Sequence, residues 1–96
     1  MQPLFSPFAI NGLHLKNRIV MPGLASFLIG ADGSVSDAAV EHYRRRAAGG
    51  PAMIIMEACA VSPEGVVSNH QACIYDDRFI EGLCKIAAVI KSEGAV

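Results

Sequence analysis

The stretch Arg18–Ser26 has the residue types and spacing that most favour a ligand site. An apolar run, Ile19-Val20-Met21, stops at Pro22-Gly23 and gives way to small residues such as Ala25. Apolar runs of this kind are typical of buried parallel strands, and α/β proteins bind ligands in the loops that follow such strands. The stretch therefore predicts one edge of a ligand site, although Pro22-Gly23 taken alone more often only ends a strand.

Four other side chains could take part in chemistry, but each has a simpler structural interpretation. Glu57, at the end of a predicted strand, is interpreted as a structural carboxylate paired with Arg18 or with a backbone amide. His42 and Tyr43 fall on a predicted helix and are interpreted as packing and hydrogen-bonding residues. His70 could line the mouth of a site, but an exposed loop residue is the simpler interpretation.

The cysteines point to a reducing compartment. Cys59, Cys73 and Cys84 form an odd set without Cys-x-x-Cys spacing, which argues against a disulfide framework and against a zinc site. Each is interpreted as a small apolar residue, buried or half-buried. We therefore expect a cytoplasmic location and no metal ligands in this chain.

The first half of the chain predicts a hairpin, a strand and a helix. Asn11-Gly12 lies between two short apolar runs and suits a type I′ turn, which predicts a β-hairpin over residues 8–15. A strand follows over 19–22, then a loop rich in small residues. Ser34 or Ser36 is the expected N-cap of a helix over 36–48, which Gly49-Gly50-Pro51 ends.

The second half repeats the strand and the helix. The run 52–58 is short, apolar and bounded by prolines, which predicts a second buried strand. Residues 59–76 are expected to form a long loop, and Asp76 or Asp77 to cap a helix over 77–93. The apolar residues of that helix recur at steps of four, three and four, so one face is expected to be buried. Residues 95–96 resemble the start of a third strand.

This order of elements predicts an α/β fold in which a parallel sheet is covered by helices. Two strands and two helices cannot close such a sheet, and a (β/α)₈ barrel needs roughly 250 residues. We therefore expect residues 1–96 to be the N-terminal portion of a single barrel domain, in a truncated chain whose hairpin precedes the first barrel strand.

Composition excludes several classes of function. The net charge is −1, with 52% apolar and 18% charged residues, so no basic surface for nucleic acid is expected. No stretch approaches the roughly 18 consecutive apolar residues of a membrane span, and no secretory signal pattern is seen at the N-terminus. We therefore expect neither a nucleic-acid partner nor a membrane.

Several short motifs, in register over nearly the whole chain, resemble the Old Yellow Enzyme family of NADH:flavin oxidoreductases. The resemblance is closest to its bacterial branch of 2,4-dienoyl-CoA reductases and bile-acid-pathway oxidoreductases. The residues that carry it are Leu4-Phe5-Ser6-Pro7 with Asn11-Gly12, Leu15-Lys16-Asn17-Arg18-Ile19-Val20-Met21-Pro22, His42-Tyr43 with Arg46-Ala47, Ile54-Ile55-Met56-Glu57-Ala58, and Glu64-Gly65.

The resemblance implies an FMN-binding TIM barrel capped at its bottom by the hairpin. Members take hydride from NAD(P)H onto FMN and deliver it to an activated C=C bond, as in enones or dienoyl-CoA. The implied cofactor-binding residues are Pro22, Gly23, Leu24 and Ala25 at the first strand end, and Ala58 at the second. Small side chains at these positions let a flat isoalloxazine ring approach the backbone.

The resemblance also implies that the catalytic residues and any iron–sulfur ligands lie outside this sequence. Many relatives have Cys or Thr at the position of Ala25, which cannot donate a hydrogen bond to the flavin. The family's catalytic His, Asn and Tyr residues correspond to positions beyond Val96, so no catalytic residue is assigned here. An iron–sulfur cluster is expected only downstream, since the three cysteines do not match its motif. A homo-oligomer is left open for a full-length form.

Two alternatives stay open. One is another FMN barrel, of dihydroorotate dehydrogenase type, against which the hairpin and the Lys16–Pro22 motif argue. The other is a chain without catalysis, which is a truncated fragment or an assembly partner. The apolar strand faces of the isolated 96 residues would be uncovered, so we expect them to associate and not to bind FMN tightly.

Overall fold

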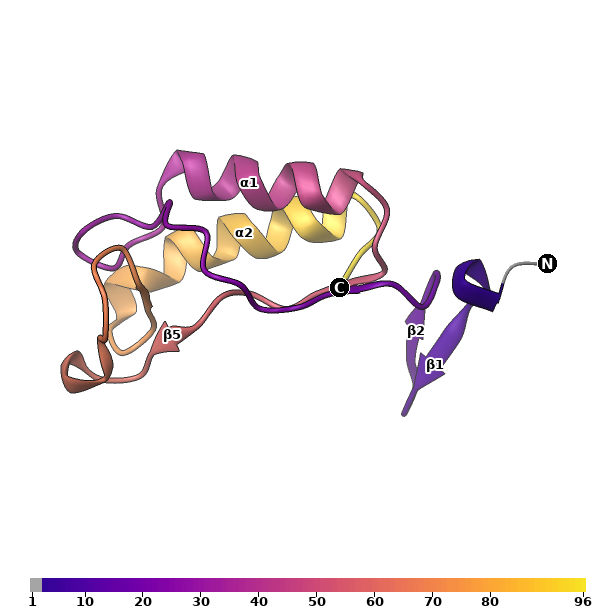
Figure 1. Cartoon of the computed structure of the whole chain (residues 1–96), viewed down its shortest axis with the longest axis horizontal. Helices are drawn as coiled ribbons and strands as arrows, with labels where there is room; N and C mark the ends of the chain where they lie inside the picture. Colours follow the sequence, from indigo (N-terminus) through magenta and orange to yellow (C-terminus); the bar gives the residue numbers. More distant parts are fainter. Residues whose placement is uncertain (1–2) are drawn as a thin grey trace.

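The computed structural model describes residues 3–96 and has a short parallel sheet with two helices on one side of it (Figure 1). Strand β3 (Val20–Met21) pairs in parallel with β4 (Met53–Ile54), with Val20 opposite Met53 and Met21 opposite Ile54. The connection between them contains helix α1 (Asp37–Ala48), and helix α2 (Ile80–Ser92) follows the second strand. This is the β–α–β–α order that the sequence predicts.

Both strands are shorter than the predicted ranges 19–22 and 52–58. The backbone N–H of Ala52 donates to Ile19 (3.0 Å) and that of Ile55 donates to Met21 (2.9 Å), after which the ladder stops. Pro22 has no N–H with which to continue it. On the second strand, the N–H of Glu57 donates to the hydroxyl of Tyr43 instead (3.0 Å). The long strand over 52–58 is therefore wrong beyond Ile55.

The last residues of the chain lie on the other side of β4. The N–H of Val96 donates to the carbonyl of Ala52 (2.9 Å), and the N–H of Ile54 donates to the carbonyl of Val96 (2.8 Å). Two bonds from one residue to positions i and i+2 of its neighbour are the pattern of a parallel ladder. Residues 95–96 thus lie where a third parallel strand would begin, next to the second.

Each helical segment begins at a capping side chain that the sequence predicts. The Ser36 side chain accepts from the N–H of Ala39 (3.0 Å), which makes Ser36 the N-cap of α1. Asp76 accepts from the N–H of Arg78 (2.9 Å) and caps a 3₁₀ turn, η3 (Asp77–Phe79), that leads into α2. The predicted helix over 77–93 is therefore 3₁₀ in its first turn. No helix within residues 3–96 is long and apolar enough to cross a membrane.

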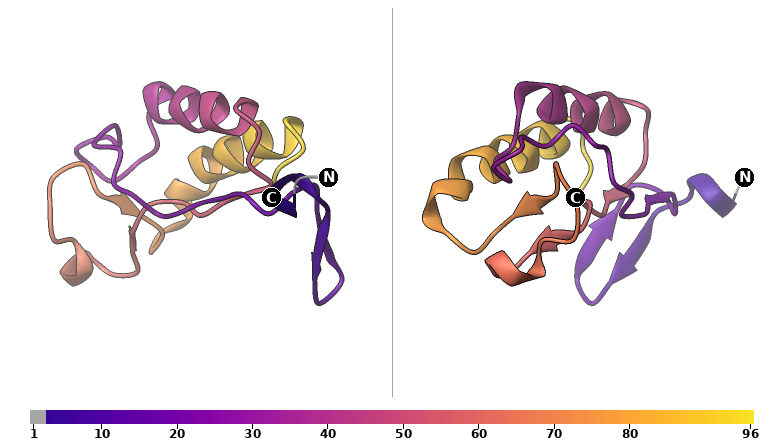
Figure 2. Two further views of the ribbon diagram at one scale, coloured as in Figure 1. Left: turned by 45° about the vertical axis from the view of Figure 1, so that its right-hand side comes forward. Right: turned by 60° about the vertical axis from the view of Figure 1, so that its left-hand side comes forward.

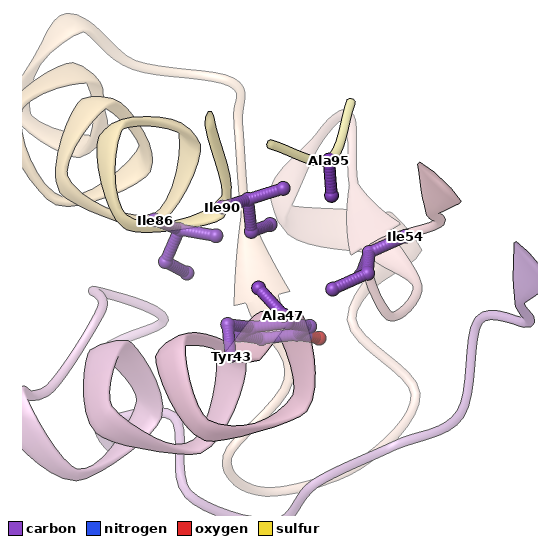
Figure 3. Close-up of a cluster of buried hydrophobic side chains, with 6 residues drawn as sticks. All are labelled: Tyr43, Ala47, Ile54, Ile86, Ile90 and Ala95. Atoms are coloured by element: carbon purple, nitrogen blue, oxygen red, sulfur yellow. The ribbon is translucent and has the colours of Figure 1, made fainter. Parts of the chain in front are cut away.

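The core lies between the helices and one face of the sheet (Figure 3). Because side chains alternate along a strand, Ile54 points to the helices while Ile55 points away. Their exposed fractions are 8% and 51%. The buried cluster also draws on both helices and on the C-terminal segment, and its members are Tyr43, Ala47, Ile54, Ile86, Ile90 and Ala95.

The segment after the second strand is more ordered than the predicted loop over 59–76. Strands β5 (Cys59–Ala60) and β6 (Ala72–Cys73) form a separate parallel pair. A 3₁₀ turn, η2 (Pro63–Gly65), lies between them. These pairs are too short to show the alternation from which a strand is predicted. Residues 59–76 therefore form a folded excursion at the carboxyl end of the second strand.

The N-terminal hairpin projects from the rest of the molecule (Figures 1 and 2). A 3₁₀ turn, η1 (Pro3–Phe5), precedes the antiparallel strands β1 (Phe8–Ile10) and β2 (Leu13–Leu15). The turn has φ of 45° at Asn11 and 87° at Gly12, as a type I′ turn requires. The radius of gyration is 14.4 Å, above the roughly 12.5 Å of a compact domain of this length.

Asn17 joins the beginnings of the two central strands. Its side-chain oxygen accepts from the N–H groups of Ile19 (3.0 Å) and Ala52 (3.1 Å), and its amide donates to the carbonyl of Gly50 (2.7 Å). The side chain is only 8% exposed, and these bonds satisfy it. One residue thus links the start of the first strand to the start of the second.

Candidate functional site

A recess of about 170 Å³ opens where the chain leaves the two central strands. Ala25 and Phe27 line it from the loop after β3, and Glu57 and Ala58 line it from the end of the second strand segment. The remaining lining residues belong to the excursion after that strand and are Val67, Ser68, Asn69, His70 and Gln71. The structure therefore brings together Ala25 and Ala58, two of the five predicted site residues.

The other three predicted residues do not line the recess. Pro22 ends the first strand, and Leu24 is 65% exposed without lining the recess. Gly23 lies against the second strand, since a Cβ built on it would be 2.9 Å from the carbonyl oxygen of Met56. Glycine at this position therefore allows the first loop to approach the second strand closely.

Glu57 joins both walls of the recess to helix α1. One carboxylate oxygen accepts from the backbone N–H of Ser26 (3.2 Å), and the other accepts from the hydroxyl of Tyr43 (2.7 Å). Glu57 is 4% exposed and Tyr43 is fully buried. Burial, together with the hydrogen bond to Glu57, raises the pKa of Tyr43 well above its usual value.

The predicted backbone partner of Glu57 is confirmed, but the alternative ion pair with Arg18 is wrong. The Arg18 guanidinium donates to Ser6 (3.1 Å) and lies over the ring of Phe8, 4.8 Å from its centroid. Arg18 thus fixes the hairpin. His42 and Tyr43 take the packing roles expected of them, with ring centroids 5.1 Å apart in an edge-to-face arrangement.

Phe27 and His70 also line the recess. Phe27 was not among the predicted site residues, whereas His70 takes the lining position that was the alternative to a plain exposed loop residue. Both have positive φ, 60° and 62°, which is uncommon for bulky side chains. The Nδ1 atom of His70 lies 2.7 Å from the carbonyl oxygen of Ile29, so this ring joins the two loops that border the recess. The signal for Phe27 in the sequence was an aromatic residue two positions after Ala25, in the loop that follows the first strand. Backbone strain of this kind concentrates at functional sites.

The cysteines do not form a metal centre. No group of three or more Cys, His, Asp or Glu side chains within residues 3–96 could hold a metal ion. Cys73 is buried and Cys84 is exposed, while Cys59 is half-buried. Burial, and to a lesser degree the charge of Glu57, raises the pKa of the Cys59 thiol, so this thiol is not activated as a nucleophile.

The recess fits one part of a flavin nucleotide. Its alanines and the exposed Phe27 offer an apolar wall to a flat ring. Its volume of about 170 Å³ is below the ~300–1,000 Å³ of a complete ligand pocket. None of the lining residues, all within the described part of the chain, is Lys or Arg, so the wall lacks a cation for a phosphate group. The residues present therefore fit the ring system of FMN and not its phosphate.

Solved structures that are similar to this chain include Old Yellow Enzymes and a 2-naphthoyl-CoA reductase. An Old Yellow Enzyme from Pichia sp. AKU4542 is 29% identical, with a TM-score of 0.89 over 97% of this chain and 24% of its own. The Old Yellow Enzyme homologue from Zymomonas mobilis is 27% identical, with a TM-score of 0.90 over 99% of this chain and 26% of its own. A 2-naphthoyl-CoA reductase in complex with 2-naphthoyl-CoA is 26% identical, with a TM-score of 0.94 over 97% of this chain and 14% of its own.

The chain spans about a quarter or less of the length of these solved structures. The likeness covers the sheet, both helices and the residues around the recess, and its fold is that of the N-terminal part of their barrels. The family model of the NADH:flavin oxidoreductases and NADH oxidases matches residues 3–96, nearly the whole sequence. The chain therefore belongs to the NADH:flavin oxidoreductase / NADH oxidase family, as its resemblance to Old Yellow Enzymes implied.

Proposed function

We propose that residues 3–96 form one wall of the FMN site in an ene-reductase that uses NAD(P)H to reduce activated C=C bonds. The observation that supports this most directly is the meeting of Ala25 and Ala58 in one recess at the ends of the two central strands. In α/β barrels that edge is where ligands bind. The similar proteins named above are reductases or Old Yellow Enzymes, which favours unsaturated carbonyl compounds, free or as CoA thioesters, as the substrate class.

The residues of this chain would shape the site. When bound, FMN supplies the hydride transfer between the nicotinamide and the substrate. Pro22, Gly23 and Leu24 would carry the backbone past the edge of the ring, while Ala25 and Ala58 would leave room for its face. Phe27 would exclude water. We assign no catalytic residue within residues 3–96.

We also propose that the hairpin covers the base of the barrel. A groove of about 270 Å³ between the hairpin and the first strand is lined by Phe8, Ile10, Leu15, Arg18 and Val20. Val20 lies on the sheet face that points away from the helices, so the groove continues the surface that would become the barrel interior. The hairpin is thus placed to cover the amino ends of the strands, opposite the recess.

Two finer expectations remain proposals. The three free cysteines support a reducing cytoplasm as the location. An iron–sulfur cluster would need ligands from another part of the protein, because the cysteines within residues 3–96 do not converge.

A hybrid barrel tests the proposed function. Residues 3–96 would replace the matching quarter of the Zymomonas mobilis homologue, and the purified hybrid would be examined for stoichiometric flavin absorbance and NAD(P)H-dependent reduction of an enone. We expect a yellow, active protein. An Ala25→Thr variant should change the flavin reduction potential, because threonine adds a hydrogen-bond donor that alanine lacks.

Other outcomes would contradict the proposal. A folded but colourless hybrid would show that these residues do not form a flavin wall and would favour the assembly-partner alternative. An unchanged potential in Ala25→Thr would remove Ala25 from the site. A yellow hybrid that oxidises dihydroorotate and leaves enones untouched would favour the other type of FMN barrel.

A further inference from the structure

We propose that Glu57, held in place by Tyr43, is the positioning residue that sets the spacing between the two walls of the recess. The proposal rests on the proposed function, because it assigns the spacing to flavin binding. It concerns three residues that have no direct part in the chemistry: Tyr43, Glu57 and Ser26.

The hydrogen bond between Ser26 and Glu57 joins the two walls of the recess. Each partner in this bond is next in the chain to one of the two lining alanines. Ser26 follows Ala25 in the chain, and Glu57 precedes Ala58. The Ser26 N–H donates to a carboxylate oxygen of Glu57 at 3.2 Å. Each alanine is therefore one residue away from this bond. A change in the bond shifts the two alanines relative to each other, and with them the width available to a flat ring.

Tyr43 leaves Glu57 little freedom to move. Its hydroxyl donates to the second carboxylate oxygen (2.7 Å) and accepts from the N–H of Glu57 (3.0 Å), so it holds both the side chain and the backbone. The Tyr43 ring lies in the core with Ile54 and Ile86 (Figure 3). The position of the carboxylate is thus fixed by the packed side of the sheet.

The partners of the carboxylate orient it and do not neutralise it. The two ion pairs seen within residues 3–96 are Glu41–Arg44 and Glu81–Lys85, and neither involves Glu57. Both oxygens accept from uncharged donors instead. Because hydrogen bonds depend on direction as well as distance, two of them to one carboxylate define its orientation. A packing role alone would not require a carboxylate at this position.

The test uses the 96-residue chain labelled with ¹⁵N, and lumiflavin as the probe. Lumiflavin is the flavin ring system without ribityl phosphate, which matches a wall that lacks cations, and NMR titration detects weak binding. In the unmodified chain we expect saturable shifts at the amides of Ala25 and Ala58. In Glu57→Ala the Ser26 amide proton should move upfield, and lumiflavin affinity should fall about tenfold.

Two variants separate positioning from general destabilisation. Glu57→Gln keeps an oxygen that can accept from Ser26, so it should restore affinity to within about threefold of the unmodified chain. Tyr43→Phe keeps the ring in the core but releases the carboxylate, so it should weaken binding about threefold even if Glu57→Ala does not fold. Glu64→Gln changes an exposed carboxylate outside the recess and is the matched control.

The possible results separate failure of the positioning role from failure of the proposed function. Equal lumiflavin affinity in the unmodified chain, Glu57→Ala and Tyr43→Phe would overturn the positioning role while leaving the flavin wall intact. A Glu57→Gln variant as weak as Glu57→Ala would also overturn it. Absence of any shift at Ala25 and Ala58 in the unmodified chain, together with a colourless hybrid barrel, would instead contradict the proposed function, and the positioning role with it. If only the hybrid barrel binds flavin, the same variants are compared in the hybrid by their flavin affinity, with the same expected losses.

Discussion

The two faces of the central sheet differ sharply although they are formed by the same few residues. On one face, Ile54 packs against Tyr43 and Ile86 and is 8% exposed. On the other, Val20 and Ile55 are 42% and 51% exposed, and neither helix covers them. Alternation along the strands places neighbouring side chains in two different environments.

This difference teaches how stability and function are distributed in the chain. The covered face has its helices and its buried cluster, so these residues can hold their shape through their own contacts (Figure 3). The open face carries apolar side chains that neither helix covers, which fits a chain that spans about a quarter of its solved relatives. The recess lies at the end of the sheet, and its geometry is fixed from the covered side.

The largest difference in the free energy of unfolding is expected between substitutions of Ile54 and Ile55, which are adjacent in the chain but lie on opposite faces of the sheet. Ile54→Ala should lower the free energy of unfolding by about 3 kcal/mol, because it removes buried methylene groups and leaves a cavity. Ile55→Ala should cost less than about 1 kcal/mol, because half of that side chain is already exposed. Urea unfolding followed by far-UV circular dichroism measures both. Equal losses would show that the two faces are equally packed.

The next largest change in stability is expected where the loop after the first strand passes close to the second strand segment. Gly23→Ala should destabilise the chain by about 1–3 kcal/mol, because its Cβ would be 2.9 Å from the carbonyl oxygen of Met56. Gly65→Ala is the control, since its Cβ would meet no atom closer than 3.7 Å. It should change stability by less than about 0.5 kcal/mol. A neutral Gly23→Ala, measured in the same urea experiment, would show that the first loop can move away.

A smaller, pH-dependent effect should come from the covered face. The pKa of Tyr43 is raised in the folded chain, so the unfolded chain releases this proton first as the pH rises. Stability should therefore be complete below about pH 10 and fall above it, by up to ~1.4 kcal/mol per pH unit from this group. Unfolding measured between pH 8 and 11 tests this. Tyr43→Phe should remove that part of the slope, and an unchanged slope would contradict the assignment.

The smallest change in stability is expected from a substitution on the open face. That substitution should instead change how strongly the chain associates with itself. Ile55→Lys should alter unfolding by less than about 0.5 kcal/mol. It should also reduce self-association of the chain in sedimentation velocity, because it places a charge on an uncovered apolar surface. Val61→Lys, at a 73% exposed residue outside the central sheet, is the control. Identical association in both variants would show that the open face does not mediate it.

The sequence predicted the elements well where the signal was local. The caps at Ser36 and Asp76, the turn at Asn11-Gly12 and the periodic apolar residues of the helices each depend on neighbours within a turn or two. Strand ends were less predictable. The second strand was expected to reach Ala58, but the N–H of Glu57 bonds to Tyr43, a partner 14 residues away. A pattern of apolar residues carries no information about such a contact.

The site was predictable in outline for a similar reason. Ala25 and Ala58 follow the ends of adjacent parallel strands, and topology alone places such positions side by side. Phe27 was not predicted and His70 was named only as an alternative, because their positive φ values and the contact of His70 with Ile29 arise from the packing of one loop on another. The identity of the ring that we propose for the recess came from the resemblance and not from the residues alone.

The position of Asn17 decides which side chains become core. Its side-chain oxygen accepts from Ile19 and Ala52, which precede the two strands, so these bonds hold the strands in one register. A slip of one residue would turn Ile55 toward the helices and Ile54 away from them, since side chains alternate with a period of two. Asn17 is 8% exposed and does not line the recess. This single buried amide thus determines which side chains of both strands face the helices and which face away.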